Sequence, residues 1–373
     1  MQSTAVLFEP CSIGKLQLSS RIVMAPMTRD HAPGGVVGAI NAEYYRRRAA
    51  DGVGLLISEG VYIDPSAGDN EKVPHLWGES ALAGWRGVID AVHGAGGKFF
   101  PQLWHIGMAR RHNHNGIPSI GPSGLGYDAA AKTWKPIAEP MSQARIDEAV
   151  ASYGRAAAAA MACGADGIEL HGAHGYLIDQ FFWSATNHRT DWYGGDWAAR
   201  TRFACEVIRE CRRQTAPDFP ICLRFSQWKG QDYAAYLFDT AGDLEQFIAP
   251  LVDAGVDILH TSLRRYWQPA FEGSPLTLAG WTKKLSGLPV ITVGSVGLDA
   301  DHRAGRSELA PGGAYVANPT SIDRLVELFN AGEFDLVALG RALLADPHWT
   351  GKAKRGAWGE IRPYSTEIRN ILQ

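Results

Sequence analysis

The stretch VDAGVDILH at Val252–His260 decides the fold of this chain. Its first residues end a helical pattern of apolar side chains, Gly255 stops that helix, and the short apolar run Ile258–Thr261 then reads as a strand. The stretch NAGEFDLVALGR at Asn330–Arg341 repeats this order, with Gly332 as the stop. A helix followed by a glycine and a buried strand is typical of βα units, so both stretches predict parallel strands.

Short apolar runs of this kind recur along the whole chain, each ending in a polar or glycine-bearing loop. There are eight of them, at Ile22–Met27, Gly54–Ser58, Lys98–Leu103, Gly167–Leu170, Ile221–Phe225, Ile258–Thr261, Val290–Val293 and Leu336–Leu339. Helical patterns lie between them, such as the one that Ser142 can cap and Gly164 can end. Because eight βα units close a barrel, the predicted fold class is α/β, a single (β/α)8 TIM barrel over residues 1–373.

Two segments depart from the βα order. Leu7–Ser20 contains a Gly-Lys turn between short alternating stretches, which predicts a β-hairpin that closes the bottom of the barrel. Gly107–Pro140, after the third strand, is rich in Gly, Pro, His and Asn and predicts a long loop. Loops of that length within compact domains tend to be functional.

Composition restricts the class of protein. The chain has 373 residues, 46% of them hydrophobic and 20% charged, with a formal net charge of −3, so we expect no nucleic-acid partner. No stretch approaches a membrane span and the first residues do not form a secretory signal, so we expect no membrane association. The five cysteines include no C-x-x-C pair, which indicates a reduced, cytoplasmic protein. For the oligomeric state, both a monomer and a dimer are compatible with the sequence.

The most informative candidate catalytic residues directly follow the fourth apolar run, Gly167–Leu170, in the segment HGAHGYL. His171 and His174 lie three residues apart, and Tyr176 follows two residues later. Two neutral imidazoles can hold a carbonyl oxygen while a phenol delivers a proton nearby, which suits an α,β-unsaturated carbonyl substrate. The other interpretations of H-x-x-H are a zinc pair, or histidines that cap a strand.

The remaining strand ends supply the other candidate site residues, because barrel enzymes build their active sites at the carboxyl ends of the strands. These residues are Ala25, Pro26, Met27, Thr28, Gly60, Gln102, Trp104, Arg224, Gly294, Gly340 and Arg341. Arg224 interrupts the apolar strand ICLRFS, and a buried arginine is costly unless it is paired, which favours a functional role. Gly294 and the Gly340-Arg341 pair follow strands seven and eight, where such barrels often bind phosphate.

Several motifs now occur together in one order: APMT, PQLWH, HGAHGYLIDQF, TNHRTDWYGG, LRFS and LGR. With them the chain closely resembles the Old Yellow Enzyme family of FMN-dependent ene-reductases, from about Leu7 to Leu344. The resemblance implies an enzyme that binds FMN, takes reducing equivalents from NAD(P)H, and reduces the C=C bond of activated carbonyl or nitro compounds.

The resemblance also implies roles for individual residues. Thr28, Gln102 and Arg224 would contact the flavin ring, with Arg224 at its pyrimidine end. His171 and His174 would hold the substrate oxygen, and Tyr176 would protonate the α-carbon. Aromatic side chains from loops would line the pocket: Trp104 and Tyr266, with Tyr62, Trp228 and Trp267 as further candidates. The loop that carries Asn187, Arg189, Asp191 and Tyr193 would support the site.

Two loops differ from the common family pattern. They read FSQWKGQDY at Phe225–Tyr233 and SLRRYWQPAFEG at Ser262–Gly273. Arg264 and Arg265 would meet an acidic substrate or the phosphate of the nicotinamide cofactor, or face water. An alternative function on the same fold is oxidative N-demethylation of a betaine or amine. A more distant alternative is a flavin-free, metal-dependent barrel enzyme; we expect no metal, because no ordered acidic or cysteine partner accompanies the histidines.

Overall fold

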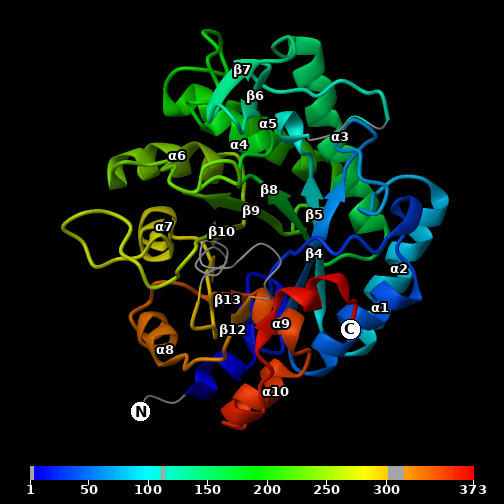
Figure 1. The fold of residues 1–373 in the computed structure, drawn as a ribbon, viewed down its shortest axis with the longest axis vertical. Helices are drawn as coiled ribbons and strands as arrows, with labels where there is room; N and C mark the ends of the chain where they lie inside the picture. The colour runs from blue at the N-terminus through cyan, green and yellow to red at the C-terminus, as the bar shows by residue number, and fades with distance from the viewer. Residues whose placement is uncertain (1–3, 111–112, 114, 301–314) are drawn as a thin grey trace.

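Eight parallel strands close into a barrel in the computed structural model, which describes residues 4–110, 113, 115–300 and 315–373 (Figure 1). The barrel strands are β3 (Ile22–Met24), β4 (Leu55–Tyr62), β5 (Lys98–Trp104), β8 (Ile168–His171), β9 (Ile221–Ser226), β10 (Ile258–Ser262), β11 (Val290–Val293) and β13 (Leu336–Leu339). The last strand pairs with the first, with Val337 opposite Ile22. The predicted barrel is therefore confirmed, and all eight predicted runs contribute a strand to it.

Two strands end more than one residue away from the predicted position, and the other six end within one residue of it. β3 ends at Met24 rather than Met27, shortly before Pro26, whose nitrogen has no hydrogen to donate to a neighbouring strand. β4 continues past Ser58 to Tyr62 because a bulge between Ile57 and Gly60 restores its register with β5.

Helices surround the barrel and bury their apolar faces against its outer surface (Figure 1). They are α1 (Ala39–Ala50), α2 (Glu79–Gly94), α3 (Gln143–Ala162), α4 (Leu177–Phe182), α5 (Trp197–Gln214), α6 (Ala241–Asp253), α7 (Leu278–Ser286), α8 (Asp323–Asn330), α9 (Arg341–Ala345) and α10 (Trp349–Lys354). Ser142 caps α3 as predicted, accepting the amide hydrogen of Arg145. Gly164 follows α3 with φ +91°, a left-handed conformation that favours glycine.

The N-terminal hairpin closes the barrel at the end where the strands begin. It consists of β1 (Cys11–Ile13) and β2 (Leu16–Leu18), which pair antiparallel as predicted. Ile13, Leu16 and Leu18 form one apolar cluster with side chains of the barrel strands, including Leu55 and Phe100. The cavity described below lies at the opposite end.

The segment predicted as a long loop after the third strand contains regular structure. Its strands β6 (Leu125–Asp128) and β7 (Thr133–Pro136) form an antiparallel hairpin, while residues 111–112 and 114 lie outside the described residues. β7 is mostly exposed, so its sequence lacks the alternation of apolar and polar residues that signals a strand. Trp134 of this hairpin packs edge-on against Trp183, with ring centroids 5.3 Å apart.

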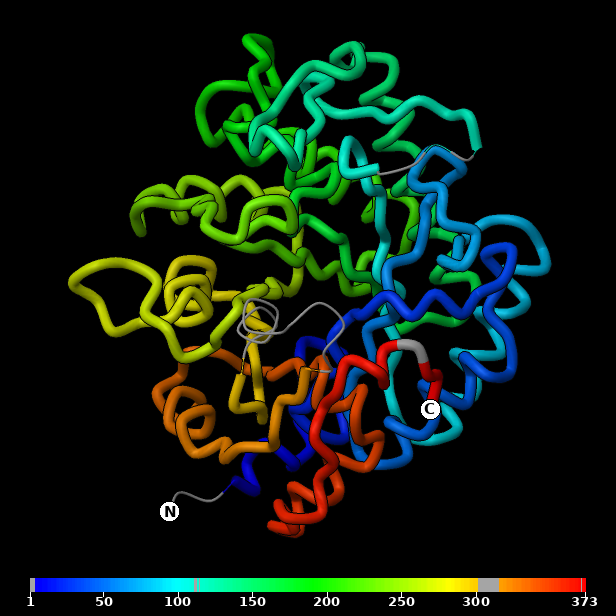
Figure 2. The backbone as a smooth tube through the Cα atoms, in the orientation of Figure 1, coloured from blue at the N-terminus to red at the C-terminus, as the bar shows by residue number. Residues whose placement is uncertain are grey.

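The C-terminal segment returns to the start of the barrel. β14 (Tyr364–Ser365) pairs with β12 (Val316–Ala317), and the last residues lie beside the first βα unit (Figure 2). The Arg29 guanidinium donates to the carbonyl oxygens of Arg369 and Ile371, at 3.0 Å and 2.8 Å. These contacts bring a segment beyond the family motifs next to the carboxyl ends of the strands.

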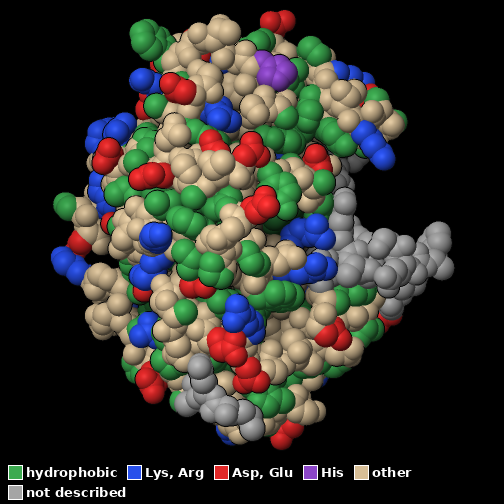
Figure 3. All heavy atoms as spheres, turned by 90° about the vertical axis from the view of Figure 1, so that its left-hand side faces the viewer, with side chains coloured by type: hydrophobic (Ala, Val, Ile, Leu, Met, Phe, Trp, Pro, Cys, Tyr) green, Lys and Arg blue, Asp and Glu red, His purple; other side chains and the backbone are tan. Residues whose placement is uncertain are grey.

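Acidic and basic side chains are interspersed over the face shown in Figure 3, and neither sign forms a continuous patch there. Among the described residues, no helix combines the length and the apolar character that crossing a membrane would require.

Candidate active site

A cavity of about 400 Å³ opens at the carboxyl ends of the barrel strands. The structure brings fourteen of the predicted site residues together around it: Ala25, Pro26, Met27, Thr28, Gly60, Gln102, Trp104, His171, His174, Tyr176, Arg224, Gly294, Gly340 and Arg341. A cavity of this size is in the range of small-molecule sites.

Tyr266 is the predicted site residue that does not line this cavity. Its ring is buried against the protein interior, 5% exposed, and meets Trp267 edge-on at 5.0 Å. Its backbone nitrogen donates to the carbonyl oxygen of Gly294, so Tyr266 supports the end of β11 instead. Of the further aromatic candidates, Trp228 lines the cavity, whereas Tyr62 lies behind Trp104, with stacked rings 5.4 Å apart.

The imidazole of His171 contacts both the imidazole of His174 and the phenol of Tyr176. His171 ends β8, and its ring centroid is 5.1 Å from that of His174 and 4.9 Å from that of Tyr176. The chain between them turns through left-handed conformations, with φ +65° at His174 and +84° at Gly175. Such a conformation is rare for a residue with a side chain, and it is often found at functional sites.

Both imidazoles are held neutral. Burial lowers the pKa of His171 and of His174 well below the ordinary value, and the nearby Arg224 cation lowers both further. The amide of Ala173 donates to Nδ1 of His171 at 3.4 Å, which places the imidazole hydrogen of His171 on Nε2.

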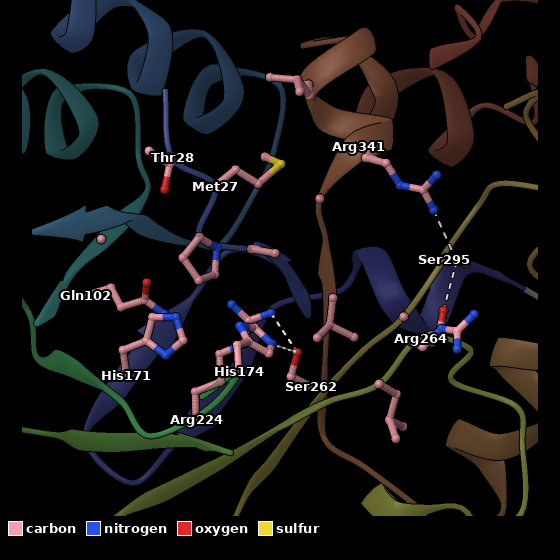
Figure 4. A pocket seen from close by; sticks show the side chains of 18 of the residues that line it. Met27, Thr28, Gln102, His171, His174, Arg224, Ser262, Arg264, Ser295 and Arg341 are labelled. Atoms are coloured by element: carbon pink, nitrogen blue, oxygen red, sulfur yellow. Dashed lines mark hydrogen bonds between the residues drawn. The ribbon is translucent and has the colours of Figure 1, made fainter. Parts of the chain in front are cut away.

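Ser262 connects His174 to Arg224 (Figure 4). Arg224 Nη2 donates to Ser262 Oγ at 3.1 Å, and the same oxygen lies 2.8 Å from His174 Nε2. The Ser262 hydroxyl can donate its own hydrogen to Nε2 while it accepts from the guanidinium, and the hydrogen of His174 is then on Nδ1. The sequence analysis did not single out Ser262 as a site residue; its position at the end of β10 was the available signal.

A buried carboxylate balances Arg224 inside the barrel. Glu169 Oε1 accepts from Gln102 Nε2 at 2.7 Å, and Oε2 lies 2.5 Å from His260 Nδ1. Burial by itself raises the pKa of Glu169, but His260, Arg224 and Gln102 together outweigh it and hold the pKa below its ordinary value. The charged carboxylate fixes the Gln102 amide, so its carbonyl oxygen remains available as an acceptor.

Cationic and backbone groups form the other end of the cavity. Arg341 Nη2 donates to Ser295 Oγ at 3.1 Å, and that hydroxyl donates to the carbonyl oxygen of Arg264 at 2.9 Å. Figure 4 shows these three residues on the side of the cavity away from Gln102 and His171.

Two cavity residues from the C-terminal segment, Tyr364 and Arg369, were missed by the sequence analysis, because they lie beyond the last family motif. The predicted supporting loop lies outside the cavity, where Arg189 donates to the carbonyl oxygens of Pro122 and Met141. Across the part of the chain that the structure describes, no three His, Cys, Asp or Glu side chains are grouped as metal ligands would be.

Comparison with known proteins gives consistent matches. Residues 6–310 match the model of the NADH:flavin oxidoreductase / NADH oxidase family. The chain is 35% identical over 367 residues to an NADH oxidase from Thermoanaerobacter brockii, covering 95% of this chain and 52% of that protein. It is 42% identical over 218 residues to 12-oxophytodienoate reductase 7 of Oryza sativa subsp. japonica, covering 56% of this chain and 55% of the relative.

The chain thus spans about half the length of the curated relatives it matches. Among solved structures, the Old Yellow Enzyme homologue from Zymomonas mobilis superposes with a TM-score of 0.79 at 25% identity, covering 98% of this chain and 97% of that one.

Proposed function

The chain belongs to the NADH:flavin oxidoreductase / NADH oxidase family, the Old Yellow Enzyme family, and from this membership we propose that it reduces activated C=C bonds. Its cofactor is FMN. The proposed substrates are α,β-unsaturated carbonyl or nitro compounds, and the proposed reductant is NAD(P)H. The observation that carries the proposal is that neutral His171 contacts both the neutral imidazole of His174 and the phenol of Tyr176 at the cavity.

The residues present fit FMN. Arg224 is 6% exposed, lines the cavity, and its Nε has no hydrogen-bond partner among the described residues. A buried cation with an unused donor suits the polar, electron-accepting edge of the ring. Thr28 and Gln102 would hold the ring alongside Arg224, and Gly294, Gly340 and Arg341 would hold the phosphate. When bound, FMN supplies the hydride that reduction of the alkene requires.

His171 and His174 would bind the substrate oxygen. Each is neutral and carries one hydrogen, so each can donate one hydrogen bond: from Nε2 in His171, and from Nδ1 in His174 when the Ser262 hydroxyl donates to Nε2. Negative charge grows on that oxygen in the transition state, where preorganised donors stabilise it more than in the ground state. Loss of one such donor costs roughly 2.7–4 kcal/mol at comparable sites.

Tyr176 would deliver the proton to the substrate's α-carbon. Its ring is held between His171 and Trp104, each with its ring centroid 4.9 Å away and nearly perpendicular. Fixing the ring in this way keeps the hydroxyl at one place relative to the oxygen-binding pair, as general acid catalysis requires.

The proposed reaction has two halves, reduction of the flavin by NAD(P)H and reduction of the alkene by the flavin. Measuring the two halves separately tests the proposal. Tyr176→Phe removes the proton donor and little volume, so NAD(P)H oxidation and FMN content should stay near those of the parent protein. Reduction of 2-cyclohexenone should fall by roughly 10²–10⁴-fold, whereas quinones, which need no carbon protonation, should be reduced almost as before. Tyr193→Phe is the matched control, since the Tyr193 hydroxyl contacts Glu206 outside the cavity. Equal losses in both half-reactions would contradict the assigned role.

A further inference from the structure

A fully buried ion pair lies behind the loop that carries His174 and Tyr176. Lys229 Nζ is 2.6 Å from Asp179 Oδ1, and both side chains are 0% exposed. Lys229 comes from the loop after β9 that departs from the family pattern, and Asp179 from the short helix α4. Burying two charges is costly, so a pair of this kind needs additional hydrogen bonds to persist.

The additional hydrogen bonds connect the ion pair to the loop that carries His174 and Tyr176, which we call the catalytic loop. The second oxygen of Asp179 accepts the amide hydrogen of Gly175 at 2.6 Å. Lys229 Nζ also donates to the carbonyl oxygen of Ser226 at 3.1 Å, and Ser226 Oγ accepts the amide hydrogen of His174 at 3.0 Å. The amide of Gly230, next to Lys229, donates to the carbonyl oxygen of His174 at 3.0 Å.

These contacts hold the left-handed turn of the catalytic loop. Both backbone polar groups of His174 and the amide of Gly175 bond to groups placed by the ion pair or by its immediate neighbours. A non-glycine residue in a left-handed conformation persists only where its surroundings determine it. The loop after β9, which carries Lys229, also places Trp228 against the His174 ring, with stacked ring centroids 4.3 Å apart. The His174 imidazole is thereby held in place by the hydrogen bonds of its backbone and by the indole ring stacked on its face.

We propose that Lys229 and Asp179 are positioning residues: their ion pair fixes the turn at His174 and Gly175, and so sets His174 and Tyr176 for binding and protonating the substrate. This inference rests on the proposed function. It assigns to the divergent Phe225–Tyr233 loop a role in the geometry of the oxygen-binding pair. Neither residue lines the cavity, so neither touches the substrate.

The test uses the FMN-loaded double variant Lys229→Met/Asp179→Asn, which removes both charges while the introduced side-chain amide still offers an acceptor to the backbone N–H of Gly175. We expect binding of 4-hydroxybenzaldehyde, followed by the change in flavin absorbance, to weaken about tenfold or more, because small displacements of catalytic groups have large effects. Reduction of 2-cyclohexenone should slow similarly, while flavin reduction by NAD(P)H stays within about twofold. The single variant Lys229→Met serves if the double variant does not fold, because the remaining buried carboxyl group of Asp179 can take up a proton and become neutral.

The control is Lys283→Met, which breaks the Lys283–Asp335 pair (2.8 Å), away from the cavity residues. It should lower thermal stability without changing phenol affinity. Phenol affinity and enone reduction both within about twofold of the parent would overturn the positioning role, and so would parallel loss of both half-reactions. If the parent protein itself binds no phenol and reduces no activated alkene, the proposed function fails, which is a distinguishable result.

Discussion

Substitution of one buried carboxyl group should change how the stability of the protein depends on pH. Glu59, in β4, is 1% exposed, and burial raises its pKa to about 7 although the amide of Arg29 donates to Oε2 at 2.8 Å. Arg29 follows Thr28 at the cavity, so Glu59 supports the backbone of a predicted flavin contact. The perturbation is Glu59→Gln, which keeps the shape and one acceptor but never ionises.

The magnitude follows from the two pKa values. Glu59 has an ordinary pKa of 4.5 in the unfolded chain and a pKa of about 7 in the folded protein. Between these pH values the folded protein keeps a proton that the unfolded chain has lost, so folding becomes less favourable as pH rises. At about 1.4 kcal/mol per pKa unit, this cost reaches roughly 3 kcal/mol above pH 7 and is absent below pH 4.5.

The assay compares urea denaturation midpoints of the parent protein and Glu59→Gln from pH 5 to pH 8. Stability of the variant relative to the parent should rise with pH by an amount approaching roughly 3 kcal/mol. Glu43→Gln is the control: Arg46 and Arg47 lower the pKa of exposed Glu43 to about 2, so it does not titrate in this window. Parallel profiles for the parent and Glu59→Gln would refute the reasoning.

Three further outcomes are expected. Heat should release non-covalent FMN, identified by chromatography; recovery of FAD would contradict the cavity assignment. His171→Ala or His174→Ala should each weaken phenol binding and slow alkene reduction by roughly 10²–10³-fold, with a smaller effect on NAD(P)H oxidation. Ser262→Ala should free Nε2 of His174 and weaken phenol binding, whereas Ser262→Thr should preserve it; NMR of ¹⁵N-labelled histidine would show whether the hydrogen leaves Nδ1.

Local sequence patterns sufficed for the barrel, because each βα unit carries its own glycine stop and apolar strand. The β6–β7 hairpin was missed because β7 is mostly exposed and has no burial pattern to read. Tyr266 was predicted to line the pocket as an aromatic residue of a loop, but the direction of its ring depends on packing with Trp267, which spacing does not encode.

Partners within the site were harder to predict than the site itself. Glu169 was counted in an apolar run, although a charge in a buried strand signals an internal partner, here Gln102 and His260. Lys229 was noticed only as part of an unusual loop, since Asp179 lies 50 residues earlier and only the folded barrel brings them together. Motifs thus predicted the groups that line the cavity, and tertiary structure was needed for the side chains that hold those groups in place.

The hairpin at the start of the barrel offers a practical route to oriented attachment. Lys15 lies at its turn with a side chain 79% exposed, and its ion pair with Asp218 is a surface contact that contributes little to stability. Because the hairpin closes the end of the barrel opposite the cavity, a tether through position 15 would leave the cavity mouth facing the solution. If the protein were immobilised on an electrode or a bead in this way, the mouth of the cavity would stay clear of the support.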